Sequence, residues 1–200
     1  MLVFFSAKII KLAFLSCRFG GNDYLCDFKI VVMETTGTKL YSLSLRDAKT
    51  YLYSLLFVAG NIVLPRLCHF IPNGGPMFLP IFFFTLIAAY KYGVVAGLLT
   101  AVLSPLANFL LFGMPSAAVL PYVLVKSVLL AVAAAWAARR FGKVSLLVLV
   151  AVVLFYQVVG TFVQCLFVGD MVSMPSMLLV AVPGMLIQVL VGYMVIDRLG

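Results

Sequence analysis

The residues of this sequence that could do chemistry are polar side chains set at helical spacing inside long apolar segments. They form three stripes, namely Thr100, Ser104 and Asn108; Tyr122 and Lys126; and Gln157, Thr161 and Gln164. Residues three or four apart share one face of a helix. In hydrocarbon, polar side chains are costly unless they face the interior of a bundle or a cavity. The stripes therefore indicate either a mostly apolar small-molecule pocket with a few placed polar groups or hydrogen bonds that only hold a bundle together.

We favour the pocket because stripes from three segments converge below one surface in the orientation deduced below. Four of these side chains fall in the outer half of the membrane, and the other two lie nearer its middle. The predicted substrate-binding residues are Asn108, Tyr122, Lys126, Gln157, Thr161 and Gln164.

Lys126 is the strongest single candidate among them, because it is a charged residue inside an apolar segment. It lies about nine residues, or roughly 13 Å, inside its apolar segment, and no acidic residue lies within any of these segments. The lysine could extend its charge toward the surface, pair with Asp170, be a neutral amine, or meet an anionic ligand. We predict the ligand role, in which the solute supplies the missing negative charge.

Metal, redox and enzymatic chemistry are not expected. Cys17, Cys26, Cys68 and Cys165 show no C-x-x-C spacing, and the only histidine, His69, has no partner motif. The motifs H-E-x-x-H, G-x-S-x-G and G-x-x-x-x-G-K-[ST] are absent from the sequence. We therefore predict a protein that is not an enzyme and that carries no cofactor and no metal.

The elements that must position the stripes are membrane-spanning helices. Hydrophobic residues make up 65% of the sequence and charged residues 10%, whereas soluble domains are about half apolar and a quarter charged. The apolar residues come in blocks of about 18 to 25, and about 20 helical residues cross a bilayer core. We predict an all-α membrane protein, a bundle of six transmembrane helices within a domain of residues 50–200. The predicted spans are 51–70, 76–90, 93–112, 117–138, 144–168 and 175–196.

Residues 1–49 are set apart from this domain as an N-terminal extension. A signal peptide is the obvious candidate, but Lys8 and Lys11 interrupt its apolar region. Met33 is followed by a polar stretch typical of a start. We predict a partly disordered extension or, preferably, an over-extended start upstream of a real start at Met33.

The basic residues of the short loops indicate the orientation. One side collects Arg46, Lys49, Lys91, Arg139, Arg140, Lys143 and Arg198. The other side carries Arg66, His69 and Asp170. Because Lys and Arg are retained on the cytoplasmic side during insertion, we predict a multi-pass protein of the bacterial inner membrane with both termini cytoplasmic. The net charge of +8 is spread along the chain, so a nucleic-acid partner is not expected.

Small residues recur every four positions at Gly93, Gly97 and Ala101. Such spacing lets helix backbones approach closely in lipid. Close packing inside the bundle is the interpretation we favour for this row, and a docking face for a separate membrane subunit is the functional alternative.

Three stretches together resemble the substrate-binding S components of energy-coupling factor (ECF) vitamin transporters. These are Gly75 to Pro80, Tyr90 to Gly97, and Leu103 to Pro115. The resemblance implies a membrane protein that captures a vitamin-like molecule at its outer face. It also implies delivery through an ECF coupling transmembrane subunit and two ATPases. In that family an A-x-x-x-A pattern in the first span contacts the coupling subunit, and the corresponding region here, Ser54 to Gly60, lacks a clean repeat.

The main alternative is a six-span membrane scaffold protein of the rod-shape-determining type, which binds no solute. A scaffold has no need of inward polar groups, whereas a binding protein explains Asn108, Lys126 and Gln164. A self-sufficient secondary transporter would show inverted repeats or broken helices, and neither is clear in the sequence.

Overall fold

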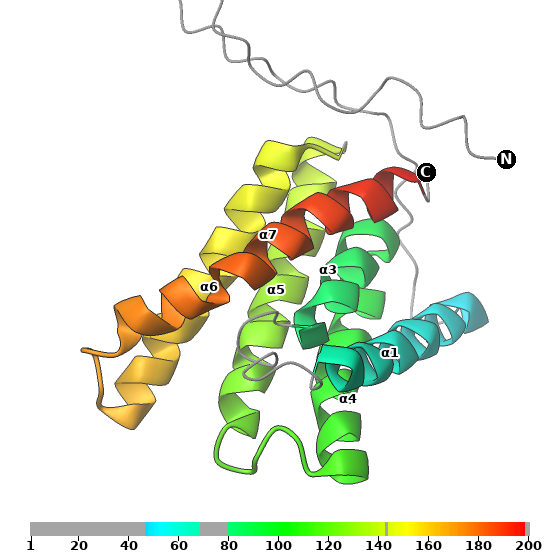
Figure 1. Cartoon of the computed structure of the whole chain (residues 1–200). Helices are drawn as coiled ribbons and strands as arrows, with labels where there is room; N and C mark the ends of the chain where they lie inside the picture. The colour runs from blue at the N-terminus through cyan, green and yellow to red at the C-terminus, as the bar shows by residue number, and fades with distance from the viewer. Residues whose placement is uncertain (1–46, 69–79, 143, 199–200) are drawn as a thin grey trace, which may run out of the picture. The chain divides into compact units, whose positions relative to one another are not determined.

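A computed structural model describes residues 47–68, 80–142 and 144–198, all within one compact unit, Thr35–Gly200. These residues form helices and no strand, as predicted. The helices are α1 (Ala48–Cys68), α3 (Pro80–Tyr92), α4 (Val94–Phe112), α5 (Leu120–Phe141), α6 (Leu146–Val168) and α7 (Met174–Arg198) (Figure 1). Most of the predicted extension, including Met33, lies outside the described residues.

Four of the helices, α4 to α7, are long and apolar enough to cross a membrane. They also expose large apolar side chains such as Leu110, Leu147 and Phe167, which soluble monomers rarely do over wide surfaces. The helices indicate a membrane-embedded protein. Within the described ranges, α1 and α3 are not among these candidate spans. The structure therefore supports four of the six predicted membrane spans. At 13 residues, α3 is about 20 Å long.

The links that join α4 to α5, α5 to α6 and α6 to α7 alternate between two ends of the bundle. In Figure 1 the α4–α5 and α6–α7 links lie at the lower end of the view and the α5–α6 link at the upper end. Gly113 and Gly169 end α4 and α6 in the left-handed conformation, with φ of 66° and 77°. Their N–H groups donate to the carbonyls of Phe109 and Cys165. Glycine adopts this conformation without the Cβ penalty, so both helices end sharply at the same end of the bundle.

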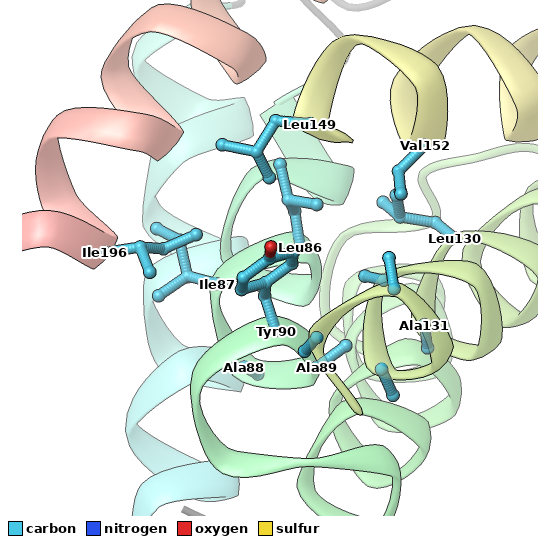
Figure 2. Packing of buried hydrophobic residues seen from close by; sticks show 14 of the residues in the cluster. Leu86, Ile87, Ala88, Ala89, Tyr90, Leu130, Ala131, Leu149, Val152 and Ile196 are labelled. Atoms are coloured by element: carbon cyan, nitrogen blue, oxygen red, sulfur yellow. The ribbon is translucent and has the colours of Figure 1, made fainter. Parts of the chain in front are cut away.

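The short helix α3 is the centre of the bundle. Eleven of its 13 residues are buried, and it packs against α1, α4, α5 and α7. Figure 2 shows Leu86 of α3 beside Leu149 of α6, and Ile87 beside Ile196 of α7. A helix covered in this way meets protein rather than solvent or lipid on most of its surface.

A polar network around Asn61 joins α1, α3 and α4. The Asn61 amide donates to Thr85 Oγ1 at 3.1 Å and to Ser104 Oγ at 3.0 Å. Its Oδ1 accepts from the Phe84 N–H at 3.2 Å, and Asn108 Nδ2 donates to the Asn61 carbonyl at 3.0 Å. The stripe predicted on 93–112 therefore serves helix packing in part, and Asn61 was not singled out from the sequence.

The small-residue row on α4 faces the interior. Gly97 and Ala101 are buried, and Gly93 is half-buried just before the helix. A Cβ on Gly97 would lie 2.5 Å from Ala89 Cβ and 2.7 Å from Ala89 Cα, closer than such atoms can approach. Gly97 thus packs α4 against α3, which is the interior packing favoured for this row. A separate subunit could reach Gly97 only after α3 moved away, so the docking prediction gains no support from this placement.

Candidate binding site at one end of the bundle

A cavity of about 580 Å³ lies at the end of the bundle that carries the α4–α5 and α6–α7 links. All six helices contribute to its walls, which are mostly apolar and include Phe82, Phe112 and Met177. The polar lining residues are Arg66, Asn108, Tyr122, Lys126, Gln157, Gln164 and Ser176. The arrangement matches the general form of small-molecule sites, which are concave and apolar with a few polar groups.

The structure brings five of the six predicted binding residues to this one cavity. They are Asn108, Tyr122, Lys126, Gln157 and Gln164. The sixth, Thr161, is fully buried and is not among the lining residues. Its Oγ1 has no hydrogen-bond partner among the described residues. The shared face of Gln157, Thr161 and Gln164 is thus only partly a cavity wall.

Lys126 reaches from α5 across α6 to the cavity. Its Nζ donates to Gln164 Oε1 at 2.9 Å. Its stem passes over Gly160, where an added Cβ would lie 2.4 Å from Lys126 Cγ. Only a glycine at this position leaves room for the lysine to lie against α6. Gly160 is therefore part of the site, although the sequence reasoning did not identify it.

The charge of Lys126 is not balanced by the described part of the chain. Its polar partner there is the neutral amide of Gln164. Asp170, the carboxylate considered from the sequence, is exposed and accepts a hydrogen bond from the Ser173 N–H at 3.3 Å instead. An ammonium group has three N–H donors, so Lys126 retains donors for a group inside the cavity.

Two neutral amides add hydrogen-bonding capacity beside this ammonium. Asn108 Nδ2 donates to the carbonyls of Asn61 and Ser104, at 3.0 and 2.9 Å, which fixes the side chain and leaves Oδ1 as an acceptor. Gln157 is almost fully buried, and its Oε1 accepts no hydrogen bond from any described residue. Buried polar groups are nearly always satisfied, so Gln157 is a lining residue whose amide oxygen lacks the partner that such an atom usually has.

Arg66 is a lining residue that the sequence reasoning placed only in an outer loop region. It is in the last turn of α1, and its guanidinium carbon lies 3.6 Å from the centroid of the Phe112 ring of α4. The sequence contains one indication of a role for Arg66, namely that it is a lone arginine on the side of the membrane that is otherwise poor in Lys and Arg. Helical spacing could not show that this arginine meets the end of α4.

No family model, curated protein or solved structure compared with the chain matches it. None of the described lining residues is His, Cys, Asp or Glu. Among the residues placed by the structure, no cluster of three or more such side chains could hold a metal ion. The described lining offers positive charge, amide hydrogen-bonding groups and an apolar wall.

Proposed function

We propose that this chain is the substrate-binding S component of an ECF-type vitamin transporter. It binds a vitamin-like small molecule with high affinity in the cavity and delivers it through a separate coupling subunit powered by two ATPases. The observation that carries the proposal is the convergence of Asn108, Tyr122, Lys126, Gln157 and Gln164 on one cavity. Residues on three helices, far apart in sequence, are needed to build it.

The size of the cavity supports solute binding over the scaffold alternative. About 580 Å³ falls within the range of about 300 to 1,000 Å³ typical of small-molecule pockets. A scaffold that only packs helices would gain stability by filling such a space, because cavities forfeit packing contacts. Polar groups directed into it, such as Lys126, would be a further cost to a scaffold.

The proposed solute is anionic or bears a carboxylate. Lys126 has donors directed at the cavity and no carboxylate partner within the described ranges, as shown above. An anionic group on the solute would balance this charge in surroundings where an unpaired cation is costly.

We also propose that α1 and α3 cross the membrane, which makes six spans together with the four candidates. The membrane is the bacterial inner membrane. Seven basic residues fall in the described helices. Five of them, namely Lys49, Lys91, Arg139, Arg140 and Arg198, lie at the helix ends away from the cavity. Because the basic side of a membrane protein is cytoplasmic, both termini are inside and the cavity opens outside.

Reporter fusions test this orientation. A reporter that is active only in the cytoplasm is expected to work when fused after Arg140 or at the C-terminus, and to fail when fused after Asp170 or between Gly113 and Ser116. This outcome is expected because Lys and Arg residues are retained on the cytoplasmic side when the helices insert. The reverse pattern would place the cavity on the inner side and contradict uptake.

The transport function is tested with purified protein in two steps. Extraction in mild detergent should yield the chain with a bound small molecule that mass spectrometry identifies. Proteoliposomes should then accumulate that molecule only when the coupling subunit, both ATPases and ATP are present, because the sequence has no nucleotide-binding loop. The same proteoliposomes without ATP are the control. Accumulation by this chain alone, or a preparation with no bound molecule, would count against the proposal.

A further inference from the structure

Arg66 stands at the cavity in a different environment from Lys126. Arg66 is exposed, whereas Lys126 is only 9% exposed, yet both line the same cavity. The guanidinium of Arg66 stacks over Phe112 at 3.6 Å, so it is held by the end of α4 rather than left free in solution. The cavity thus has one cation in its interior and one on an exposed part of its wall.

Within the described ranges these two are the basic residues at this end of the bundle, where the α6–α7 link also carries the exposed carboxylate of Asp170. The acidic residues in the described ranges are Asp47, Asp170 and Asp197, and none of them lines the cavity. The other basic residues of those ranges lie at the opposite helix ends, as described above. A solvent-exposed charge at the edge of a site acts mainly on association, by steering a charged partner. A buried charge acts mainly on dissociation, because breaking its contact leaves it unpaired.

We propose that Arg66 is a second anion-recognition residue, which captures the anionic group of the solute at the mouth of the cavity before Lys126 holds it inside. The inference rests on the proposed function and extends it. The solute class is an apolar molecule with an anionic group, and the two cations act on different steps of its binding. The Phe112 ring orients the Arg66 guanidinium for the first step, since cation–π stacking restricts its position.

A pair of probes of matched shape tests the role of charge. Naphthalene-2-carboxylate and naphthalene-2-carboxamide have the same apolar body, and only the first is an anion. Their association and dissociation rates are measured by surface plasmon resonance on the full chain in nanodiscs, at low and high salt. Arg66→Gln is expected to slow carboxylate association about threefold to tenfold at low salt. The difference should shrink at high salt because exposed charges are screened.

Three further measurements separate recognition from a purely structural role of Arg66. Arg66→Lys should retain most of the association rate, because it keeps the charge. Arg140→Gln is the matched control, since it removes the same charge at the opposite end of the bundle and should leave the carboxylate rates unchanged. Binding of the carboxamide should be the same in Arg66→Gln as in the unmodified protein.

Four outcomes would overturn the inference. They are an unchanged carboxylate association rate in Arg66→Gln, an equal loss in Arg140→Gln, an equal loss for the carboxamide, and no preference of the unmodified protein for the carboxylate. None of them by itself refutes solute binding. The proposed function fails separately, if no small molecule co-purifies with the chain or if the chain alone accumulates it.

Discussion

Replacing Lys126 with Met is expected to lower the affinity for the solute by about 1 to 3 kcal/mol, the range of a hydrogen bond to a charged group. Methionine is similar in length and apolar, so the protein should insert and fold normally. The expected loss follows from the contacts of Lys126, which has a neutral amide partner in Gln164 at 2.9 Å and donors left for an anion. Calorimetry with the co-purified solute, on protein freed of it, measures the change.

A second variant displaces Lys126 without removing its charge. Gly160→Ala puts a methyl group where Lys126 Cγ lies 2.4 Å away, so the lysine stem must move off α6. Affinity should fall in the same direction as in Lys126→Met. Gly192→Ala is the control, because its new Cβ meets only Leu86 Cδ2, at 3.3 Å. Unchanged affinity in Lys126→Met, or a solute that is neutral or cationic, would give Lys126 a structural or snorkelling role instead.

Gly97→Ala is expected to destabilise the bundle by about 1 to 3 kcal/mol, the usual cost of overpacking. The new methyl group would lie 2.5 Å from Ala89 Cβ and 2.7 Å from Ala89 Cα, and the second of these atoms is backbone. The helices α3 and α4 must therefore separate. Thermal unfolding of purified protein in detergent should show a lower midpoint for Gly97→Ala than for Gly192→Ala.

The same variant distinguishes internal packing from subunit docking. Internal packing predicts lower stability of the isolated chain and partial recovery when Ala89→Gly is added, because one of the two close contacts is removed. A docking face predicts normal stability of the isolated chain and weaker assembly with a coupling subunit. Normal stability of Gly97→Ala would thus contradict the α3–α4 contact and revive docking at Gly93, Gly97 and Ala101.

The helices themselves could be predicted closely from the sequence. The segments 93–112 and 144–168 end at the same residues as α4 and α6, because a glycine follows each apolar run and ends the helix. The segment expected at 76–90 is observed as α3 from Pro80 to Tyr92. A proline suits the first turn of a helix, where its missing N–H costs nothing.

The neighbours of each helix face were harder to predict. Helical spacing shows which residues share a face but not which helix covers that face. It correctly grouped Gln157 with Gln164, but it could not show that Thr161 between them is away from the cavity wall. It also could not show that Asn61 meets Thr85 and Ser104. Thr50, Ser54 and Asn61 recur at helical spacing and are all buried, so the sequence carried a signal for a polar face there, but the partners on other helices appear only in three dimensions.

The central position of α3 has a consequence for the order in which the protein is assembled during synthesis. Of the described helices that pack against α3, α1 precedes it in the chain, while α4, α5 and α7 are translated later. In the six-span arrangement proposed above, α3 enters the bilayer before most of its neighbours exist. The part of its surface that α7 covers, which includes Ile87 beside Ile196 (Figure 2), has no protein partner until α7 is made. The ribosome must therefore finish nearly the whole chain before the translocated helices can close around their own core.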